Sequence, residues 1–262
     1  MTSSINQLYK ACEESIELAE QILQDCHSKE KKVLSPYRGV VSFYFRRSWE
    51  ILESFVILIK NNRLVDATLL LRSFCNMFID LVYISAEPAT KELKLLKYML
   101  ERDRNQLKLI NTNLDDLKKL DSDIGLRKDK LEKNIKEVEE ELKSKYPKEK
   151  SWELPCIADR AYKAGKTPFM LYNMAYRPYS NVEHNNVLFG ENYVDEDKCE
   201  PKSSPEQGIE KSPFFQPKVT LQLLSQLFLE ILKKFNEEFQ LDYEGKIVEM
   251  MEKVKASVKD KE

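Results

Sequence analysis

The segment from Tyr176 to Asn185 brings together a guanidinium and an imidazole that could act on a phosphate. Arg177 and His184 are seven residues apart, close to two turns of a helix, so both side chains would lie on one face. An imidazole that titrates near neutral pH can move a proton, and a guanidinium can bind a phosphate and stabilise its developing charge. Together they could cut RNA without a metal, with the ribose 2′-hydroxyl as nucleophile. The alternative is structural, with His184 capping a helix end or pairing with nearby groups.

A line of three polar side chains crosses the most apolar predicted helix. Arg72, Asn76 and Asp80 recur at four-residue spacing among leucines and aromatic residues, which places them on one side of that helix. A helix that is apolar nearly all round is buried nearly all round, and buried charge is costly unless it is paired. Two interpretations stay open. The line is a structural network in which Arg72 binds Asp80 or Glu50, or it faces an internal polar site.

The preceding predicted helix supplies matching groups. Arg46 and Glu50 are one turn apart, and Glu53 and Ser54 follow them. One interpretation is an ion pair on the helix surface, which contributes little to stability. The apolar residues around this pair favour partial burial of Glu50 instead.

Periodicity and turn residues predict the helices that position these groups. Gly is scarce, at six residues, while 33% of the chain is charged and 42% is hydrophobic, which favours helices over strands. We therefore predict an all-α fold. The expected helices span residues 4–26, 36–60, 64–85, 151–164, 168–176, 219–239 and 243–258. The short connection at residues 61–63 makes the second and third of these an antiparallel pair.

The stretch from Lys91 to Lys145 has the pattern of a coiled coil. Leucine, isoleucine and valine follow an alternating three-four register, with Asp103, Asp121 and Lys128 as the gaps. We expect a turn at Asp121–Gly125, which would make a protruding charged hairpin. One unbroken helix, roughly 80 Å long, is the alternative.

This pattern divides the chain into a core and an insertion. Residues 1–90 and 150–262 are expected to form the helical bundle core, and residues 91–146 the coiled-coil hairpin inserted into it. Residues 185–217 hold four of the ten prolines and are expected to be a mobile loop.

Composition excludes several classes of protein. The formal net charge is −2, so the chain as a whole is not a basic nucleic-acid-binding surface, and RNA contact would need a local basic patch. No secretory signal is expected, and no apolar run approaches the length of a membrane span. Five cysteines without a CxxC pair, and only two histidines, indicate a cytoplasmic protein with reduced thiols and no metal. A nucleotide-binding module without turnover is a weaker alternative, because the sequence has no Gly-rich loop that could hold a phosphate.

Several short motifs carry a resemblance to a known family. They are Arg47-Ser48-Trp49-Glu50, Leu71-Arg72-Ser73-Phe74, Tyr176, Ser180 and His184. In order and helix placement they resemble a bacterial helical family of unknown function over residues 42–184, which in turn resembles the HEPN group (higher eukaryotes and prokaryotes nucleotide-binding). HEPN ribonucleases carry an Arg followed, after four to six residues, by a His, as do Arg177 and His184. Two positions depart from these patterns, Pro178 directly after the Arg and Asn76 where the related family often has an acid.

The resemblance implies a four- or five-helix bundle, often dimeric, and in many members a metal-independent ribonuclease of toxin–antitoxin or anti-phage systems. It implies that His184 acts as general acid or base and that Arg177 binds the scissile phosphate of RNA. The supporting residues would be Glu50, Arg72, Asn76, Asp80, Tyr176 and Ser180. A homodimer without cofactor, acting away from membranes, is expected.

The alternative hypothesis is a non-catalytic scaffold. The polar line would then be a buried structural network, and the charged hairpin would bind a protein partner or form the oligomer. The two hypotheses differ in where Arg177 and His184 point. Convergence in an open cleft favours the enzyme, and burial with full bonding favours the scaffold.

Overall fold

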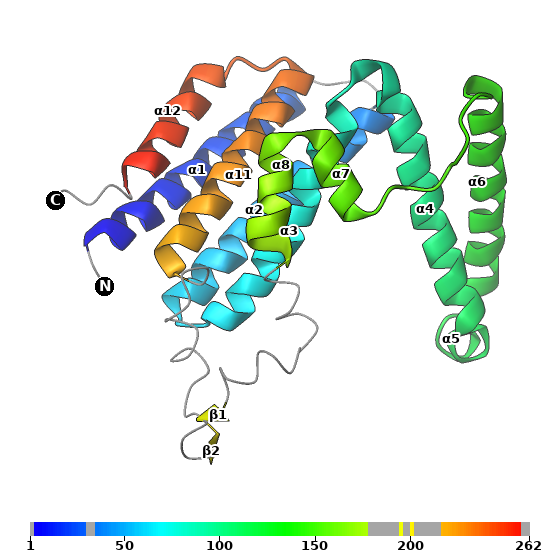
Figure 1. Ribbon diagram of the computed structural model, residues 1–262, viewed down its shortest axis with the longest axis horizontal. Coiled ribbons are helices and arrows are strands. Elements are labelled where there is room, and N and C mark those ends of the chain that lie inside the picture. Colours follow the sequence, from blue (N-terminus) through cyan, green and yellow to red (C-terminus); the bar gives the residue numbers. More distant parts are fainter. Residues whose placement is uncertain (1–2, 30–34, 178–193, 196–199, 202–215, 258–262) are drawn as a thin grey trace. The chain divides into compact units, whose positions relative to one another are not determined.

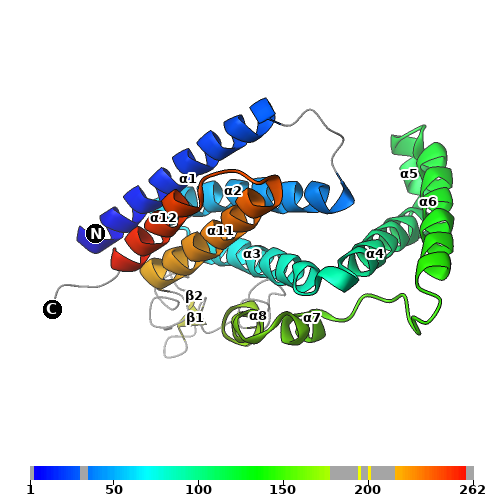
Figure 2. The same ribbon diagram turned by 90° about the horizontal axis from the view of Figure 1, so that it is seen from above.

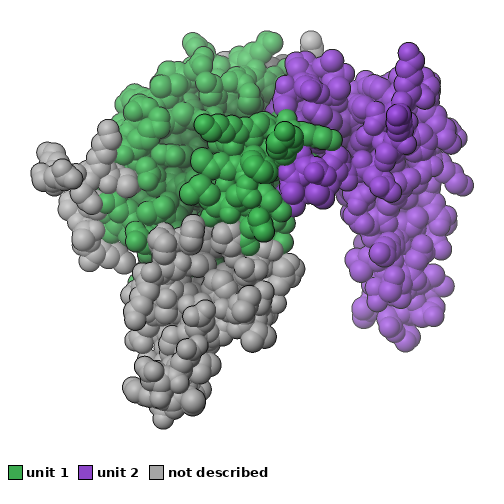
Figure 3. Space-filling view, in the orientation of Figure 1, with its two compact units in different colours: residues 1–82, 160–262 green, residues 83–159 purple. Residues whose placement is uncertain are grey.

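The computed structural model describes residues 3–29, 35–177, 194–195, 200–201 and 216–257. Within these ranges the protein is built of helices, apart from a pair of two-residue antiparallel strands, β1 (Val194–Asp195) and β2 (Glu200–Pro201) (Figure 1). The predicted all-α class is therefore confirmed. The chain forms two compact units, one of Met1–Val82 with Arg160–Glu262 and one of Tyr83–Asp159 (Figure 3). The second unit begins earlier and ends later than the expected insertion at residues 91–146.

The first unit contains the longest helices of the fold. They are α1 (Ser3–Lys29), α2 (Pro36–Lys60), α3 (Leu64–Ser85), α11 (Pro217–Phe239) and α12 (Glu244–Ala256). Helix α11 packs against α1, α2 and α12 (Figures 1 and 2). Its core contacts include the rings of Phe45 and Phe235, whose centroids are 4.4 Å apart, and Cys12 Sγ, which lies 3.0 Å from Ser225 Oγ. Segments from both ends of the chain therefore share one hydrophobic core.

Capping residues set the bounds of α2. The Ser35 side chain accepts from the Arg38 N–H, and Pro36 occupies the first turn, where its missing N–H costs nothing. Asn61 caps the other end and Asn62 adopts a positive φ of 56°. The predicted bounds of α2 and α3 are confirmed. Helix α11 begins at Pro217 by the same first-turn preference, two residues before the predicted start.

The loop expected at residues 185–217 falls mostly outside the described residues. The exceptions are β1, β2 and the two residues at its end, Gln216 and Pro217. Pro217 belongs to α11, so the helix begins inside the stretch predicted as a loop.

Helix α3 is apolar over most of its length. Its residues Asp66–Ser85 are long and apolar enough to cross a membrane, so the expectation that no run approaches that length was wrong. The helix is nevertheless largely covered, since 67% of its most apolar window is buried inside the protein. The core helix of a globular protein passes the same test of length and composition.

The second unit is built on two packed helices. Its elements are the short 3₁₀ helix η1 (Pro88–Thr90) and the helices α4 (Lys91–Thr112), α5 (Leu114–Leu120) and α6 (Ile124–Lys145). Helices α4 and α6 lie side by side (Figure 1), with a core of Leu96, Leu100, Val138 and Leu142. Charged pairs flank this core: Lys97 donates to Glu149 at 2.7 Å and Arg104 to Glu139 at 2.8 Å.

The chain breaks twice between α4 and α6. One break, at Asp121–Asp123, lies within the expected turn, where the Asp121 carboxylate accepts from the Asp123 N–H at 2.9 Å. The other, at Asn113, was not expected. The stretch is therefore not one unbroken helix. Asp103, one of the gaps in the apolar register, is 2% exposed, and Arg102 donates to its carboxylate at 2.7 Å.

The helix predicted over residues 151–164 is shorter in the structure. Helix α7 spans Ile157–Ala164, because Pro155 disfavours helical backbone in the residue before it and has no N–H to donate. Gly165 ends α7, as predicted. Helix α8 (Lys166–Leu171) then begins two residues before Pro168 and continues as a π-helix, η2 (Tyr172–Tyr176).

Candidate functional site

Helix α3 lies beside α7 and α8 (Figure 2). Two residues of its polar line, Asp80 and Arg72, contact α7 and η2. At one end, Arg160 Nε on α7 donates to Asp80 Oδ1 on α3 at 2.8 Å. The two side chains are only 12% and 8% exposed. This contact is a buried salt bridge, so loss of either partner would leave the other charge buried without it.

At the other end of the line, Arg72 holds Tyr176. Arg72 Nη2 donates to Tyr176 Oη at 3.1 Å, and the guanidinium carbon lies 4.9 Å from the centre of the tyrosine ring. The ring of Tyr172 stacks on that of Tyr176 at 5.5 Å, across the single turn of η2. One guanidinium thus makes both a hydrogen bond to the hydroxyl and a cation–π contact with the ring of Tyr176. We call this contact the Arg72–Tyr176 clamp.

These partners differ from the ones that the sequence suggested. The expected partner of Arg72 was Asp80 or Glu50, whereas Asp80 accepts from Arg160 and Arg72 donates to Tyr176. Asn76 lies between the two contacts on the same side of α3. Arg160 was not singled out, although Ile157, Ala161 and Ala164 flank it at helical spacing. A charge on the apolar face of a short amphipathic helix is the signal that could have found it.

Tyr44 on α2 is a further group that the sequence analysis missed. Its side chain is nearly buried, and the charges of Asp80 and Arg160 both act on its hydroxyl. Burial raises the pKa of Tyr44 well above its usual value, the Asp80 carboxylate raises that pKa further, and Arg160 lowers it in part. Tyr44 therefore stays a neutral phenol beside the ion pair.

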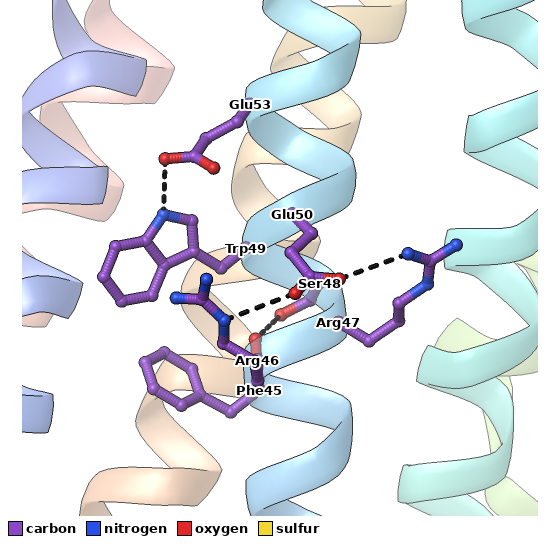
Figure 4. A network of polar contacts seen from close by, with 7 residues as sticks. All are labelled: Phe45, Arg46, Arg47, Ser48, Trp49, Glu50 and Glu53. Carbon is purple, nitrogen blue, oxygen red and sulfur yellow. Dashed lines mark hydrogen bonds and ion pairs between the residues drawn. The ribbon is translucent and has the colours of Figure 1, made fainter.

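Glu50 belongs to a different and more exposed network on α2. Its carboxylate lies 3.3 Å from Arg46 Nε and accepts from Arg47 at 3.2 Å, and its side chain is 43% exposed (Figure 4). Nearby, the indole N–H of Trp49 donates to Glu53 at 2.8 Å. Glu50 thus fits the interpretation as a helix-surface ion pair. Its apolar neighbours cover part of the side chain, and Arg46 and Arg47 bind its carboxylate at the surface.

Arg177 closes the π-helix and is exposed. It has helical backbone angles, φ −63° and ψ −50°, and directly follows the clamped Tyr176. Ser180 and His184 lie outside the described residues, as does Pro178, so the distance between Arg177 and His184 stays a prediction. Among the residues that the structure describes, no group of three or more His, Cys, Asp or Glu side chains could hold a metal ion.

Comparison with known proteins places these residues in a family. A model of a family of unknown function, DUF5677, matches residues 38–201 of the chain. The match covers more than half of the protein. The chain belongs to the DUF5677 family. No curated protein and no solved structure matches it.

The DUF5677 match confirms the expectation of an uncharacterised family and includes the candidate site. The matched range begins inside α2 and contains α3, the second unit, α7, α8 and η2. Every candidate residue from Glu50 to His184 falls within it. Helices α1, α11 and α12, which complete the core of the first unit, lie outside the DUF5677 match.

Proposed function

We propose that this protein is a HEPN-like, metal-independent endoribonuclease, an effector of a bacterial anti-phage or toxin–antitoxin system. The observation that carries the proposal is the Arg72–Tyr176 clamp, which holds the backbone directly before the exposed Arg177. A catalytic phosphate-binding group needs a fixed position and access to substrate. The clamp supplies the first and the exposure of Arg177 the second.

The π-helix that carries the clamp supports the same proposal. π-helices are rare, appear mostly as single turns, and are frequent at functional sites. In this protein the π-turn spans Tyr172–Tyr176 and ends at the proposed phosphate-binding residue. A purely structural connection could continue α8 as an ordinary α-helix, because residues 172–176 include no glycine or proline.

The proposed reaction uses side chains of this chain alone. Arg177 binds the scissile phosphate and stabilises its developing negative charge. His184 removes the proton of the ribose 2′-hydroxyl, or protonates the leaving 5′-oxygen, and a second group or water performs the other transfer. The 2′-oxygen attacks phosphorus, the bond to the 5′-oxygen breaks, and the products are a 2′,3′-cyclic phosphate and a 5′-hydroxyl end.

In this proposal the polar line is a positioning device. Asp80 and Arg160 fasten α7 to α3, and Arg72 and Tyr176 fasten η2 to α3. Asn76 lies between the two contacts. Glu50, a further supporting residue of the proposal, pairs with Arg46 and Arg47 on α2.

We also propose that the active species is a homodimer that pairs through α2. Phe43 and Ile57 are large apolar residues that are mostly exposed on this helix, 62% and 60%. They lie fourteen residues apart, close to four turns, with Arg46, Arg47 and Glu50 between them. In a two-fold antiparallel pairing of α2, Phe43 of one copy meets Ile57 of the other, and Arg47 approaches Glu53, so the face is self-complementary.

The test is RNA cleavage in EDTA by the wild type, His184→Ala and Arg177→Ala, after each is shown to fold by circular dichroism. His27→Ala and Arg127→Ala are matched controls, because they remove the other histidine and an exposed arginine of the second unit. We expect cyclic-phosphate products from the wild type and both controls, and none from the two site variants. A folded wild type that cuts no RNA, together with site variants that only lose thermal stability, would contradict the proposal.

The second candidate function is a non-catalytic scaffold, and the buried Asp80–Arg160 pair is the observation in its favour. An ion pair that is almost fully covered holds parts of the fold together and does not meet substrate. In this case the charged α4–α6 pair would bind a protein partner. Deletion of residues 91–145 would then abolish partner binding, while variants at Arg177 and His184 would not affect it.

A further inference from the structure

The segment that leads to Arg177 is basic and aromatic in a chain that is neither overall. From Arg160 to Val182 there is no Asp or Glu, although 44 of the 262 residues are acidic and the net charge is −2. The segment carries four cations, Arg160, Lys163, Lys166 and Arg177, and five aromatic residues, Tyr162, Phe169, Tyr172, Tyr176 and Tyr179. Arg160 is buried against Asp80, so the exposed cations are Lys163, Lys166 and Arg177. These three form the local basic patch that RNA contact would need, since phosphate binding depends on local cations rather than on net charge.

The structure sorts these residues into an inner and an outer face. The inner face is buried and consists of Pro168, Leu171 and Ala175. The outer face is exposed. Its residues Lys166, Met170, Met174 and Arg177 recur every three or four positions, and Phe169 precedes Met170 on the same exposed face. Tyr162 and Lys163 at the end of α7 are also exposed. We call Tyr162, Lys163, Lys166, Phe169, Met170 and Met174 the platform.

Two platform residues form an exposed aromatic pair. The rings of Tyr162 and Phe169 meet edge to face, with centroids 5.7 Å apart and planes at 82°. Gly165, between the two helices, has φ +113°, a backbone conformation that brings the end of α7 beside the start of α8. Tyr162 is 72% exposed, so a large part of its ring faces solvent. Aromatic and methionine side chains exposed together mark a binding surface more often than scattered ones do.

We propose that the platform binds single-stranded RNA, whose bases stack on Tyr162 and Phe169 while Lys163 and Lys166 hold the adjacent phosphates. Exposed aromatic faces take bases of any sequence, and cations beside them follow the backbone. The strand then runs along the outer face of α8 and η2 toward Arg177. Duplex RNA is not the occupant, because its paired bases leave no face open for stacking. The choice of RNA over another polyanion rests on the proposed function.

An anionic membrane surface fits the platform less well. Helices that lie in a membrane interface present a long apolar face, whereas α8 has only six residues. The platform also offers the largely exposed ring of Tyr162, on which a base can stack. Vesicle binding is nevertheless measured as the competing outcome.

The test is fluorescence anisotropy with a labelled twelve-nucleotide single-stranded RNA and full-length protein carrying His184→Ala, so that no cutting occurs. We expect Tyr162→Ala with Phe169→Ala to weaken binding at least tenfold, and Tyr162→Phe, which keeps the ring, to bind normally. Lys163→Gln with Lys166→Gln should make the salt dependence of the affinity shallower, by about 1.4 in the logarithmic slope for two phosphates. Lys118→Gln with Lys119→Gln, two exposed cations of the second unit, is the charge control and should bind normally.

Three results would overturn the proposal: no RNA binding by the His184→Ala protein, unchanged binding after loss of both rings, or equal affinity for the matching duplex. The proposal would also be overturned if the protein with Tyr162→Ala and Phe169→Ala lost binding to phosphatidylserine vesicles but kept its affinity for RNA. That result would assign the platform to a membrane. The cleavage assay separates this inference from the proposed function. Ring-dependent binding by a protein that never cuts RNA supports the platform and contradicts the nuclease. RNA cleavage with a KM that the platform variants leave unchanged supports the nuclease and contradicts the platform.

Discussion

Asp80 on α3 and Arg160 on α7 form a 2.8 Å salt bridge, although eighty residues separate them in the chain. The pair is almost fully covered and lies beside the buried phenol of Tyr44. It fastens the segment that carries the platform and Arg177 to the core helix of the first unit.

Breaking this pair from one side should cost much more than breaking a surface pair. We expect Asp80→Ala to lower the free energy of unfolding by about 3–5 kcal/mol, because the Arg160 charge is left buried without its carboxylate. Glu50→Gln removes the carboxylate of an exposed pair and should cost less than about 1 kcal/mol. Urea unfolding followed by circular dichroism measures both. Equal losses in the two variants would show that the Asp80 pair is not buried in solution.

The Arg72–Tyr176 clamp should affect catalysis more than stability. Tyr176→Phe keeps the ring over the guanidinium but removes the hydrogen-bond acceptor, which should cost about 0.5–1.5 kcal/mol of stability. If the clamp positions Arg177, the same variant lowers kcat for RNA cleavage. Tyr172→Phe keeps the ring that stacks on Tyr176 and removes only a hydroxyl, so it should leave kcat near that of the wild type. A Tyr176→Phe protein with normal kcat would remove the positioning role.

The protein should lose stability in alkali in a way that depends on Tyr44. The folded-state pKa of Tyr44 is raised, so above an unfolded-state pKa of about 10 the unfolded chain loses the phenolic proton first. The unfolding free energy must then fall as pH rises. Burial also raises the pKa of Cys12, to about 12, which adds to the slope. Below pH 9 the unfolding free energy of Tyr44→Phe should differ from that of the wild type by a constant amount. Above pH 10 it should fall less steeply with pH than that of the wild type. Parallel curves throughout would refute the assignment.

Apolar residues of the second unit should divide into two classes. Leu142 is fully buried in the core of α4 and α6, so Leu142→Ala should cost about 2–5 kcal/mol. Leu120, at the end of α5, is 84% exposed, and Leu120→Ala should change the unfolding free energy by less than about 0.5 kcal/mol. Hydrogen exchange resolved to α4 and α6 would localise the effect. Equal sensitivity at both positions would contradict the packing.

Gly165 should be hard to replace, although there is room for a side chain. Nothing lies within 4 Å of the point that a Cβ atom would occupy here, but φ is +113°, which L residues rarely adopt. Gly165→Ala should therefore destabilise the protein by about 1–3 kcal/mol through backbone strain alone. Gly125→Ala in α6 has the same open space without the positive φ and should stabilise by up to about 1 kcal/mol. A thermal melt of both variants gives the sign of each effect.

The sequence by itself determined the helices and the need for polar partners. Pro36, Asn61 and Asn62 set the bounds of α2 because capping and first-turn preferences act within a few residues. Arg72, Asn76 and Asp80 were found because four-residue spacing on an apolar helix is a local pattern. Local patterns did not predict every helix boundary. Residues 151–156 were predicted as helix despite Pro155, and the break at Asn113 was missed.

Only the tertiary structure decided which groups meet. Asp80 binds Arg160, eighty residues away in the chain, and Arg72 binds Tyr176, 104 residues away. Glu50 instead pairs with residues of its own helix. Spacing shows that a buried charge needs a partner, but any of the 42 lysines and arginines could neutralise Asp80 as far as the sequence is concerned. The choice depends on how α7, α8 and η2 pack against α3, because hydrogen bonds and ion pairs require contact within a few ångströms.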